Sequence, residues 1–159
     1  GIPAGFISGL PIWKATAHSV ILVPSATGMT YSTSMKHVRI VNRSRPQAQP
    51  LQGGWCASFL CRLRGLAWRR KLVSGEALVD VQPNPSRSGA AIHMLGMFFD
   101  LAVIWLDDER RVVDARLAFA WRSVLQPAQA ARYVIECAPH HLDDFDIGDQ
   151  IVFEDPSLD

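Results

Sequence analysis

The sequence predicts a strand-dominated α+β fold: an antiparallel or mixed, curled or barrel-like sheet with two short helices. Three observations lead to this prediction. Short apolar segments with alternating side chains recur between residues 36 and 154, only two segments have a helical character, and the links between segments are short. Short links favour antiparallel neighbours in a sheet.

The first third of this region contains one expected strand and one expected helix. Apolar and polar side chains alternate over residues 38–40, as in a half-buried strand. Residues 43–54 carry two prolines and two adjacent glycines and are expected to form a loop. Apolar side chains over residues 55–64 recur at spacings of three and four, which predicts a short amphipathic helix that ends near Gly65. Its arginines, including Arg62, would face water.

The middle of the sequence predicts a strand and a hairpin. Residues 77–81 are a short apolar strand that the turn-forming residues 83–89 would close. Residues 101–106 are almost continuously apolar, which suggests burial on both faces. A charged turn at residues 107–110 and an alternating return over residues 112–117 complete the hairpin.

The end of the sequence predicts two strands around a short helix. Residues 132–137 are rich in side chains that favour extended chain. Residues 139–145 have room for one or two helical turns, with proline at an early position where it is tolerated. Gly148 breaks the chain before a final strand at residues 150–153.

Length and composition predict one folded domain. The 159 residues are 48% hydrophobic and 19% charged, which suits a globular core. Residues 1–34 carry one charged side chain, Lys14, and no persistent period, so we expect an extension with little structure of its own before a domain at 35–155. No stretch of about 20 apolar residues occurs. We therefore expect a soluble protein, with the cytoplasm favoured and export as the alternative.

The charge pattern gives little reason to expect a nucleic-acid partner. The formal net charge is +1, although residues 36–87 are mainly basic and residues 100–159 mainly acidic. Arginines between residues 62 and 70 alternate with Trp55 and Trp68, a pattern that could bind phosphates and stack on bases. We favour the alternative, in which the tryptophans are core residues and the arginines pair with the acidic half.

The three cysteines predict neither a metal site nor a disulfide framework. Cys56 and Cys61 are five residues apart, wider than paired zinc ligands, and Cys137 has no nearby partner in the sequence. An odd count leaves the pairing incomplete. We expect buried free thiols in a reducing compartment.

Four stretches resemble one known family. They are residues 64–76, with Arg-Gly-Leu and then Gly-Glu; residues 92–107, with His-Met leading into an apolar strand; residues 121–136, with Trp-Arg and then a strand; and Gly148-Asp149-Gln150-Ile151. In this order and at these separations they resemble domain of unknown function 192, a family of uncharacterised bacterial and archaeal proteins. The resemblance implies a fold and a bacterial source. The family has no assigned reaction, so the function stays unknown.

The sequence departs from the family pattern at three positions. Asp100 stands where the family usually has proline, Ala102 where it usually has aspartate, and Ala67 where it usually has methionine. An aspartate can accept hydrogen bonds or hold a cation, and alanine can do neither. Asp100 lies two residues from Ala102 and can share its face of a strand. If the role of the family depends on the aspartate that Ala102 replaces, this chain has lost or altered that role.

The segments of resemblance locate a candidate binding pocket formed by His93, Phe98, Asp100, Trp121 and Arg122. The arginine would recognise an anion, since its guanidinium donates hydrogen bonds in a fixed fork. We expect a small non-catalytic binding or accessory module for a small ligand or a protein partner, with no cofactor and no metal.

The alternative is a metal-assisted or hydrolase-like enzyme in which Asp100 and His93 are candidate bases. Asp100 could also pair with Asp114 or Glu136. No strand–nucleophile–helix turn and no glycine-rich phosphate loop occurs in the sequence. We therefore favour a protein that is not an enzyme, and we predict no catalytic residue.

Metal binding is a second alternative at two places. His93 and Met94 are adjacent and would point to opposite faces of a strand, so they would not hold one ion. His140 and His141 precede three aspartates, Asp143, Asp144 and Asp146, which together resemble a mixed ligand set. We favour a polar surface turn there.

Overall fold

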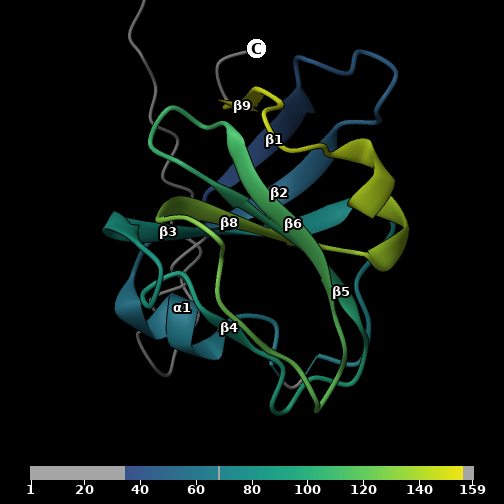
Figure 1. Ribbon diagram of the computed structural model, residues 1–159. Helices are drawn as coiled ribbons and strands as arrows, with labels where there is room; N and C mark the ends of the chain where they lie inside the picture. The colour runs from purple at the N-terminus through teal and green to yellow at the C-terminus, as the bar shows by residue number, and fades with distance from the viewer. Residues whose placement is uncertain (1–34, 68, 156–159) are drawn as a thin grey trace, which may run out of the picture. The chain divides into compact units, whose positions relative to one another are not determined.

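The structure is a computed structural model that describes residues 35–67 and 69–155 (Figure 1). Within these residues, seven strands form one mixed sheet in the order β6-β5-β8-β3-β2-β1-β9. The strands of this sheet are β1 (His37–Asn42), β2 (Leu51–Cys56), β3 (Glu76–Ser86), β5 (Leu101–Leu106), β6 (Val112–Ala118), β8 (Ala131–Cys137) and β9 (Ile151–Glu154). The expected extension at residues 1–34 lies outside the described residues.

Three short elements and one 3-10 helix complete the described fold. Strands β4 (Ile92–His93) and β7 (Val124–Leu125) form a separate two-stranded ladder. The α-helix α1 (Phe59–Arg64) precedes β3, and the 3-10 helix η1 (Pro139–Asp144) precedes β9. The predicted class is confirmed: the fold is α+β, strand-dominated, with a strongly curled mixed sheet and two short helices.

Strand β5 is buried on both faces, as its unbroken apolar sequence predicted. Alternate side chains enter two different core clusters because successive residues of a strand point to opposite faces. Leu101, Val103 and Trp105 pack on one side with residues from the α1 and β4 regions, which we call the α1-side core. Ala102, Ile104 and Leu106 pack on the other with Phe145 and Leu142, which we call the η1-side core.

The two edge strands of the curled sheet meet at one end. Arg111 next to β6 forms an antiparallel bridge with Gln150 next to β9. Two backbone hydrogen bonds flank this bridge, from Val112 N to the Asp149 carbonyl at 2.9 Å and from Ile151 N to the Arg110 carbonyl at 3.0 Å. The sheet is therefore a half-barrel whose two edges are joined locally at this bridge.

The prediction of a loop at residues 43–54 was wrong for residues 51–54, which belong to β2. Gly53 and Gly54 are buried strand residues rather than turn residues. A Cβ atom on Gly53 would lie 2.8 Å from both the Ile40 and Val79 side chains, so glycine is required by the close approach of neighbouring strands. The predicted helix correspondingly begins at Phe59 and not at residue 55.

Strand β3 is also longer than predicted. It continues beyond Val81 through the expected turn as far as Ser86, with a register shift between these two residues where it pairs with β8. Pro83 and Pro85 lie in the shifted part and are exposed, where a missing backbone donor removes no ladder hydrogen bond. The parallel pairing of β2 with β3 makes the sheet mixed. The hairpin β5–β6, strand β8 and the turns of η1 lie where they were predicted.

Candidate functional site

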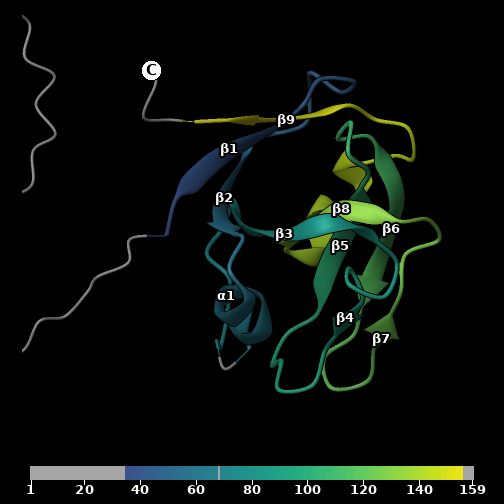
Figure 2. The same ribbon diagram turned by 90° about the vertical axis from the view of Figure 1, so that its left-hand side faces the viewer.

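A cavity of about 340 Å³ lies on the α1 side of the sheet. Figures 1 and 2 both show α1 and β4 below strands β3 and β8, and residues from these four elements line the cavity. Its polar lining residues are Arg62, Asp80, Gln82, His93 and Glu136. This volume is at the lower end of the range found for pockets that hold small molecules.

Asp80 is a buried acid in the middle of β3. It lies opposite Val134 of β8, and its side chain is 7% exposed. Its Oδ1 atom is buried and accepts no hydrogen bond from any residue that the structure describes. Burial raises the pKa of this carboxyl to about 6, against the opposing effect of the Arg62 charge.

Glu136 is the second buried acid, on the neighbouring strand β8. It pairs with Leu78 of β3 and with Val103 of β5, both members of the α1-side core. Because it lies two residues beyond Val134, it shares the face that carries Asp80. Burial first, and the nearby charge of Asp80 second, raise the pKa of Glu136 to about 8.

Arg62 carries the positive charge of the cavity. Its Nη1 atom donates hydrogen bonds to the Ala57 carbonyl at 2.7 Å and the Val81 carbonyl at 3.0 Å. The prediction that it faces water was therefore wrong, because α1 turns this side chain toward β3. The helix is held at its start by the Ser58 hydroxyl, which accepts a hydrogen bond from Cys61 N, and at its end by Gly65 with φ 46°.

A disulfide joins Cys56 of β2 to Cys61 of α1. The prediction of free thiols was wrong for these two residues and is confirmed for Cys137, which is free and buried. A spacing of five residues permits the bond because the chain turns from strand to helix between them and brings their Cα atoms to 5.5 Å. The bond ties the helix that carries Arg62 to the sheet.

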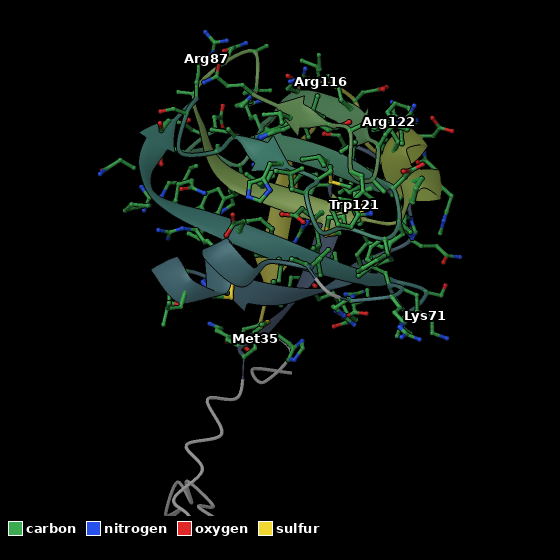
Figure 3. All side chains as sticks on the ribbon, turned by 90° about the horizontal axis from the view of Figure 1, so that it is seen from below. Met35, Lys71, Arg87, Arg116, Trp121 and Arg122 are labelled. Carbon is green, nitrogen blue, oxygen red and sulfur yellow. A yellow bond between two sulfur atoms is a disulfide. The ribbon has the colours of Figure 1, made fainter. Side chains whose placement is uncertain are left out.

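Phe98 and Trp121, two of the five residues predicted for the site, meet outside the cavity. Their rings contact edge to face with centroids 5.8 Å apart, and the side chains are 54% and 53% exposed. Trp121 has a positive φ of 63° and donates its backbone N–H to the Met94 carbonyl at 3.0 Å. Figure 3 shows Trp121 and Arg122 on one side of the domain, away from Met35.

Asp100 and Arg122 lie on the same two loops as this aromatic pair. The Oδ1 atom of Asp100 accepts a hydrogen bond from Ala120 N at 2.8 Å, and the guanidinium of Arg122 lies 5.4 Å from the ring centroid of Phe119. His93 is separate from these residues: it pairs with Val124 in the small ladder and lines the cavity. The structure thus brings four of the five predicted residues to one exposed surface, and His93 to the cavity.

The histidines and aspartates of residues 140–146 make separate contacts with their neighbours. His141 Nδ1 lies 2.8 Å from Asp144 Oδ2, and the His140 ring packs on it with centroids 4.1 Å apart. Asp146 pairs with Arg45. Across residues 35–67 and 69–155, no group of three or more His, Cys, Asp or Glu side chains is arranged to hold a metal ion.

Sequence reasoning missed Asp80 and Gln82 as site residues. The available signal was an acidic residue between Val79 and Val81 in an otherwise apolar strand, which is rarely fully buried without a role. Glu136 was considered only as a partner for Asp100. The register of β3 against β8 places it beside Asp80 instead, and the sequence does not contain that register.

Residues 38–153 match domain of unknown function 192, described as "Uncharacterized ACR". The chain belongs to this family. The UPF0127 protein of Thermococcus kodakarensis is 41% identical over 97 residues, which cover 61% of this chain and 60% of that protein. The UPF0127 protein of Thermococcus gammatolerans is 48% identical over 81 residues, 50% of each chain. The chain thus spans about half to three fifths of the length of these archaeal relatives, which do not support the expected bacterial source.

Two crystal structures share the fold of this family member. A protein from Sinorhizobium meliloti 1021 superposes with a TM-score of 0.65 at 13% identity, over 76% of this chain and 94% of that chain. A protein of unknown function from Novosphingobium aromaticivorans DSM 12444 has a TM-score of 0.64 at 17% identity, over 80% and 93%. At these identities the likeness shows the fold alone. No helix in the described part of the chain is long and apolar enough to cross a membrane.

Proposed function

We propose that the domain is a small-molecule binding module whose ligand occupies the cavity above Asp80 and Glu136. The observation that carries the proposal is the buried Asp80 Oδ1 atom, which has no hydrogen-bond partner among the described residues and belongs to a cavity-lining side chain. Leaving such an atom unsatisfied costs about 1–3 kcal/mol. A ligand with hydrogen-bond donors would supply the missing partner.

The surroundings of the two acids suit binding better than packing. Burial makes the ionised form of each carboxyl unfavourable, and the charge of Asp80 further opposes the ionisation of Glu136 on the same sheet face. Gln82 and His93 add polar groups to the same cavity. Polar groups that converge on a cavity with apolar walls can fix the orientation of a small ligand.

The test is a thermal-shift screen of small polar metabolites against the wild type, followed by a cavity-filling variant. Ala67 lines the cavity, so Ala67→Phe should abolish the shift by any true ligand. Ala130→Phe, at an exposed position outside the lining, is the matched control and should leave the shift unchanged. A library without a single hit, or hits that survive Ala67→Phe, would refute the proposal.

Of the five residues predicted from the sequence, His93 is part of this proposed site. We propose that Phe98, Asp100, Trp121 and Arg122 serve a separate surface contact, since the Phe98–Trp121 ring pair is exposed and the guanidinium of the next residue, Arg122, lies over the Phe119 ring. Replacing both rings in Phe98→Ser/Trp121→Ser should leave ligand binding in the cavity intact. A simultaneous loss of binding in a folded double variant would argue against this separation.

A catalytic role for the acid pair is the second candidate function. Asp80 and Glu136 have pKa values of about 6 and about 8, and unequal carboxyl groups in one site are the arrangement that general acid–base catalysis uses. Turnover in a panel of hydrolase substrates, abolished by Asp80→Asn and retained by Asp100→Asn, would favour it. Turnover that depends on Asp100 would favour the candidate base expected from the sequence instead.

We propose that the protein has no nucleic-acid partner and that it is exported. Arg62 is used within the cavity and Arg69 forms a two-pronged ion pair with Glu76 at 2.6 and 3.0 Å, which supports the expectation of no nucleic-acid partner. The Cys56–Cys61 disulfide favours export over the cytoplasm, because such bonds persist mainly in oxidising compartments. Thiol labelling of the protein taken directly from its cells would distinguish the two compartments.

A further inference from the structure

We propose that the ligand of this cavity is a small zwitterion with an apolar side chain, of the α-amino-acid class, held by Arg62 at one end and by Asp80 and Glu136 at the other. This inference rests on the proposed binding function and names its ligand class. Arg62 and the two acids line one cavity, and within the described residues Arg62 donates to two backbone carbonyls and forms no ion pair with either acid. A molecule with both charges can bridge them.

The acid pair suits an ammonium group. The Asp80 Oδ1 atom needs a donor, and an ammonium group carries three donors and no acceptor. Around pH 7 a pKa of about 8 keeps Glu136 largely protonated, and a pKa of about 6 leaves Asp80 largely ionised. The pair therefore carries about one negative charge, which matches one ammonium group.

Arg62 suits a carboxylate. Its Nη1 atom is held by the carbonyls of Ala57 and Val81, so the guanidinium is fixed in place before a ligand arrives. No hydrogen bond from its Nε or Nη2 atoms to another described residue is found, which leaves donors for a ligand. An oriented guanidinium binds a carboxylate by charge-assisted hydrogen bonds.

The rest of the lining suits an aliphatic side chain. Leu66, Ile92, Met94 and Met97 line the same cavity. Methionine side chains adapt to the shape of an apolar ligand. A volume of about 340 Å³ admits an amino acid and excludes a drug-sized or polymeric ligand from full burial.

The experiment compares four probes by isothermal titration calorimetry with the full chain at neutral pH. L-Leucine carries both charges, isopentylamine lacks the carboxylate, 4-methylpentanoate lacks the ammonium group, and erythritol is a neutral polyol. We expect leucine to bind more tightly than either half-molecule by on the order of tenfold or more. Equal affinity of a half-molecule, or binding of erythritol alone, would overturn the inference.

Variants assign each charge to its own partner. Arg62→Gln should weaken leucine about tenfold and leave isopentylamine unchanged, while Asp80→Asn should weaken both probes. Arg70→Gln, at an exposed arginine outside the lining, is the matched control and should bind like the wild type. Circular dichroism verifies that each variant folds. If Arg62→Gln does not fold, Arg62→Lys keeps the charge and should still reduce the preference for leucine over isopentylamine.

The outcomes separate this inference from the proposed function. If the metabolite screen yields a ligand that Ala67→Phe abolishes while leucine shows no advantage over its halves, the binding function stands and the zwitterion is wrong. If no probe binds at millimolar concentration and the screen is also empty, both proposals fail.

Discussion

At the scale of single residues, Asp80 and Glu136 are acidic side chains whose burial is unfavourable for the stability of the fold. Each is almost fully buried, burial raises the pKa of each, and the charge of Asp80 raises the pKa of Glu136 further. Because their pKa values are raised in the folded state, their contribution to stability decreases as the pH rises. A carboxylate in a salt bridge behaves in the opposite way, since its contribution is lost as the pH falls.

The first prediction concerns Glu136→Gln. In the folded protein the pKa of Glu136 is about 8 instead of 4.5, so its protonated form stabilises the fold fully below about pH 4.5 and this contribution is lost as the pH rises to about 8. Glutamine cannot ionise. The variant should therefore be more stable than the wild type at pH 9, on the order of a few kcal/mol, and similar to it at pH 5, as measured by urea unfolding.

Glu76→Gln is the control of opposite sign for this experiment. The hydrogen bond from Arg69 holds the pKa of Glu76 below its ordinary value, so its contribution is present above that value and lost in acid. Asp80, Arg62 and His93 line the same cavity and are present in both proteins, so the comparison measures the ionisation of Glu136 together with its repulsion by the Asp80 charge. Equal pH dependence of the wild type and Glu136→Gln would contradict the prediction.

The second prediction concerns the glycine pair of β2. Gly53→Ala should destabilise the domain by about 1–3 kcal/mol, because the new methyl group would overlap the packed Ile40 and Val79 side chains. Gly54→Ala should cost less, because its methyl group would meet the end of the exposed and flexible Met35 side chain. Chemical unfolding of both variants checks the ranking, and the reverse order would refute the packing explanation.

At the scale of elements, α1 depends on its attachment to the sheet. It is only six residues long, shorter than a helix that is stable alone, and it carries a lining residue of the cavity. Its position is set by the Cys56–Cys61 disulfide, by the Ser58 cap and by the contacts of Arg62 with two carbonyl groups.

The third prediction concerns this disulfide. Cys56→Ser/Cys61→Ser should lower the free energy of unfolding by about 2 kcal/mol, the value expected for a closed loop of this length, and should weaken ligand binding by releasing Arg62. Thermal unfolding with and without a reducing agent measures the effect. Reduction should lower the melting temperature of the wild type and leave the double variant unchanged, and a wild type insensitive to reduction would contradict the prediction.

At the scale of the whole molecule, the half-barrel is held together where its two edges meet. The Oδ2 atom of Asp149 accepts hydrogen bonds from Asn42 Nδ2 at 2.8 Å, Arg45 Nε at 3.0 Å and Asp146 N at 2.9 Å. These contacts hold the end of β1 and the loop after it against the turn before β9. The carbonyl of Asp149 in that turn accepts the hydrogen bond from Val112 N that joins the β6 edge to the β9 edge. Together these contacts give a structural role to the Gly-Asp-Gln-Ile stretch through which the sequence resembles its family.

The fourth prediction concerns this closure. Asp149→Ala should cost about 3 kcal/mol, because the buried Asn42 amide and the Arg45 guanidinium lose a charged acceptor. Asp108→Ala is the control: its ion pair with Arg132 at 3.2 Å is exposed and contributes about 0–1 kcal/mol. Urea unfolding of the two variants measures the difference. Similar costs would show that the closure does not depend on Asp149.

Much of the fold could be predicted because it depends on local patterns. The unbroken apolar run of β5 and the charged turn are each determined within about ten residues and appear as expected. Strand β6 lies where it was predicted, although its burial does not alternate. The two adjacent glycines of β2 were misread, because glycine marks both turns and close strand approaches. Only the neighbours Ile40 and Val79 distinguish the two, and they come from other strands.

By itself, the amino-acid sequence determined the fold class, the family and the order of most strands, since these follow from side-chain periodicity and short motifs along the chain. The tertiary structure alone decided which polar residues share a cavity. Asp80 and Glu136 are 56 residues apart in sequence and become neighbours only through the register of β3 against β8. Arg62 lines the same cavity because a disulfide and two carbonyl groups position α1. Register and helix placement are set by packing between distant segments, which no local pattern encodes.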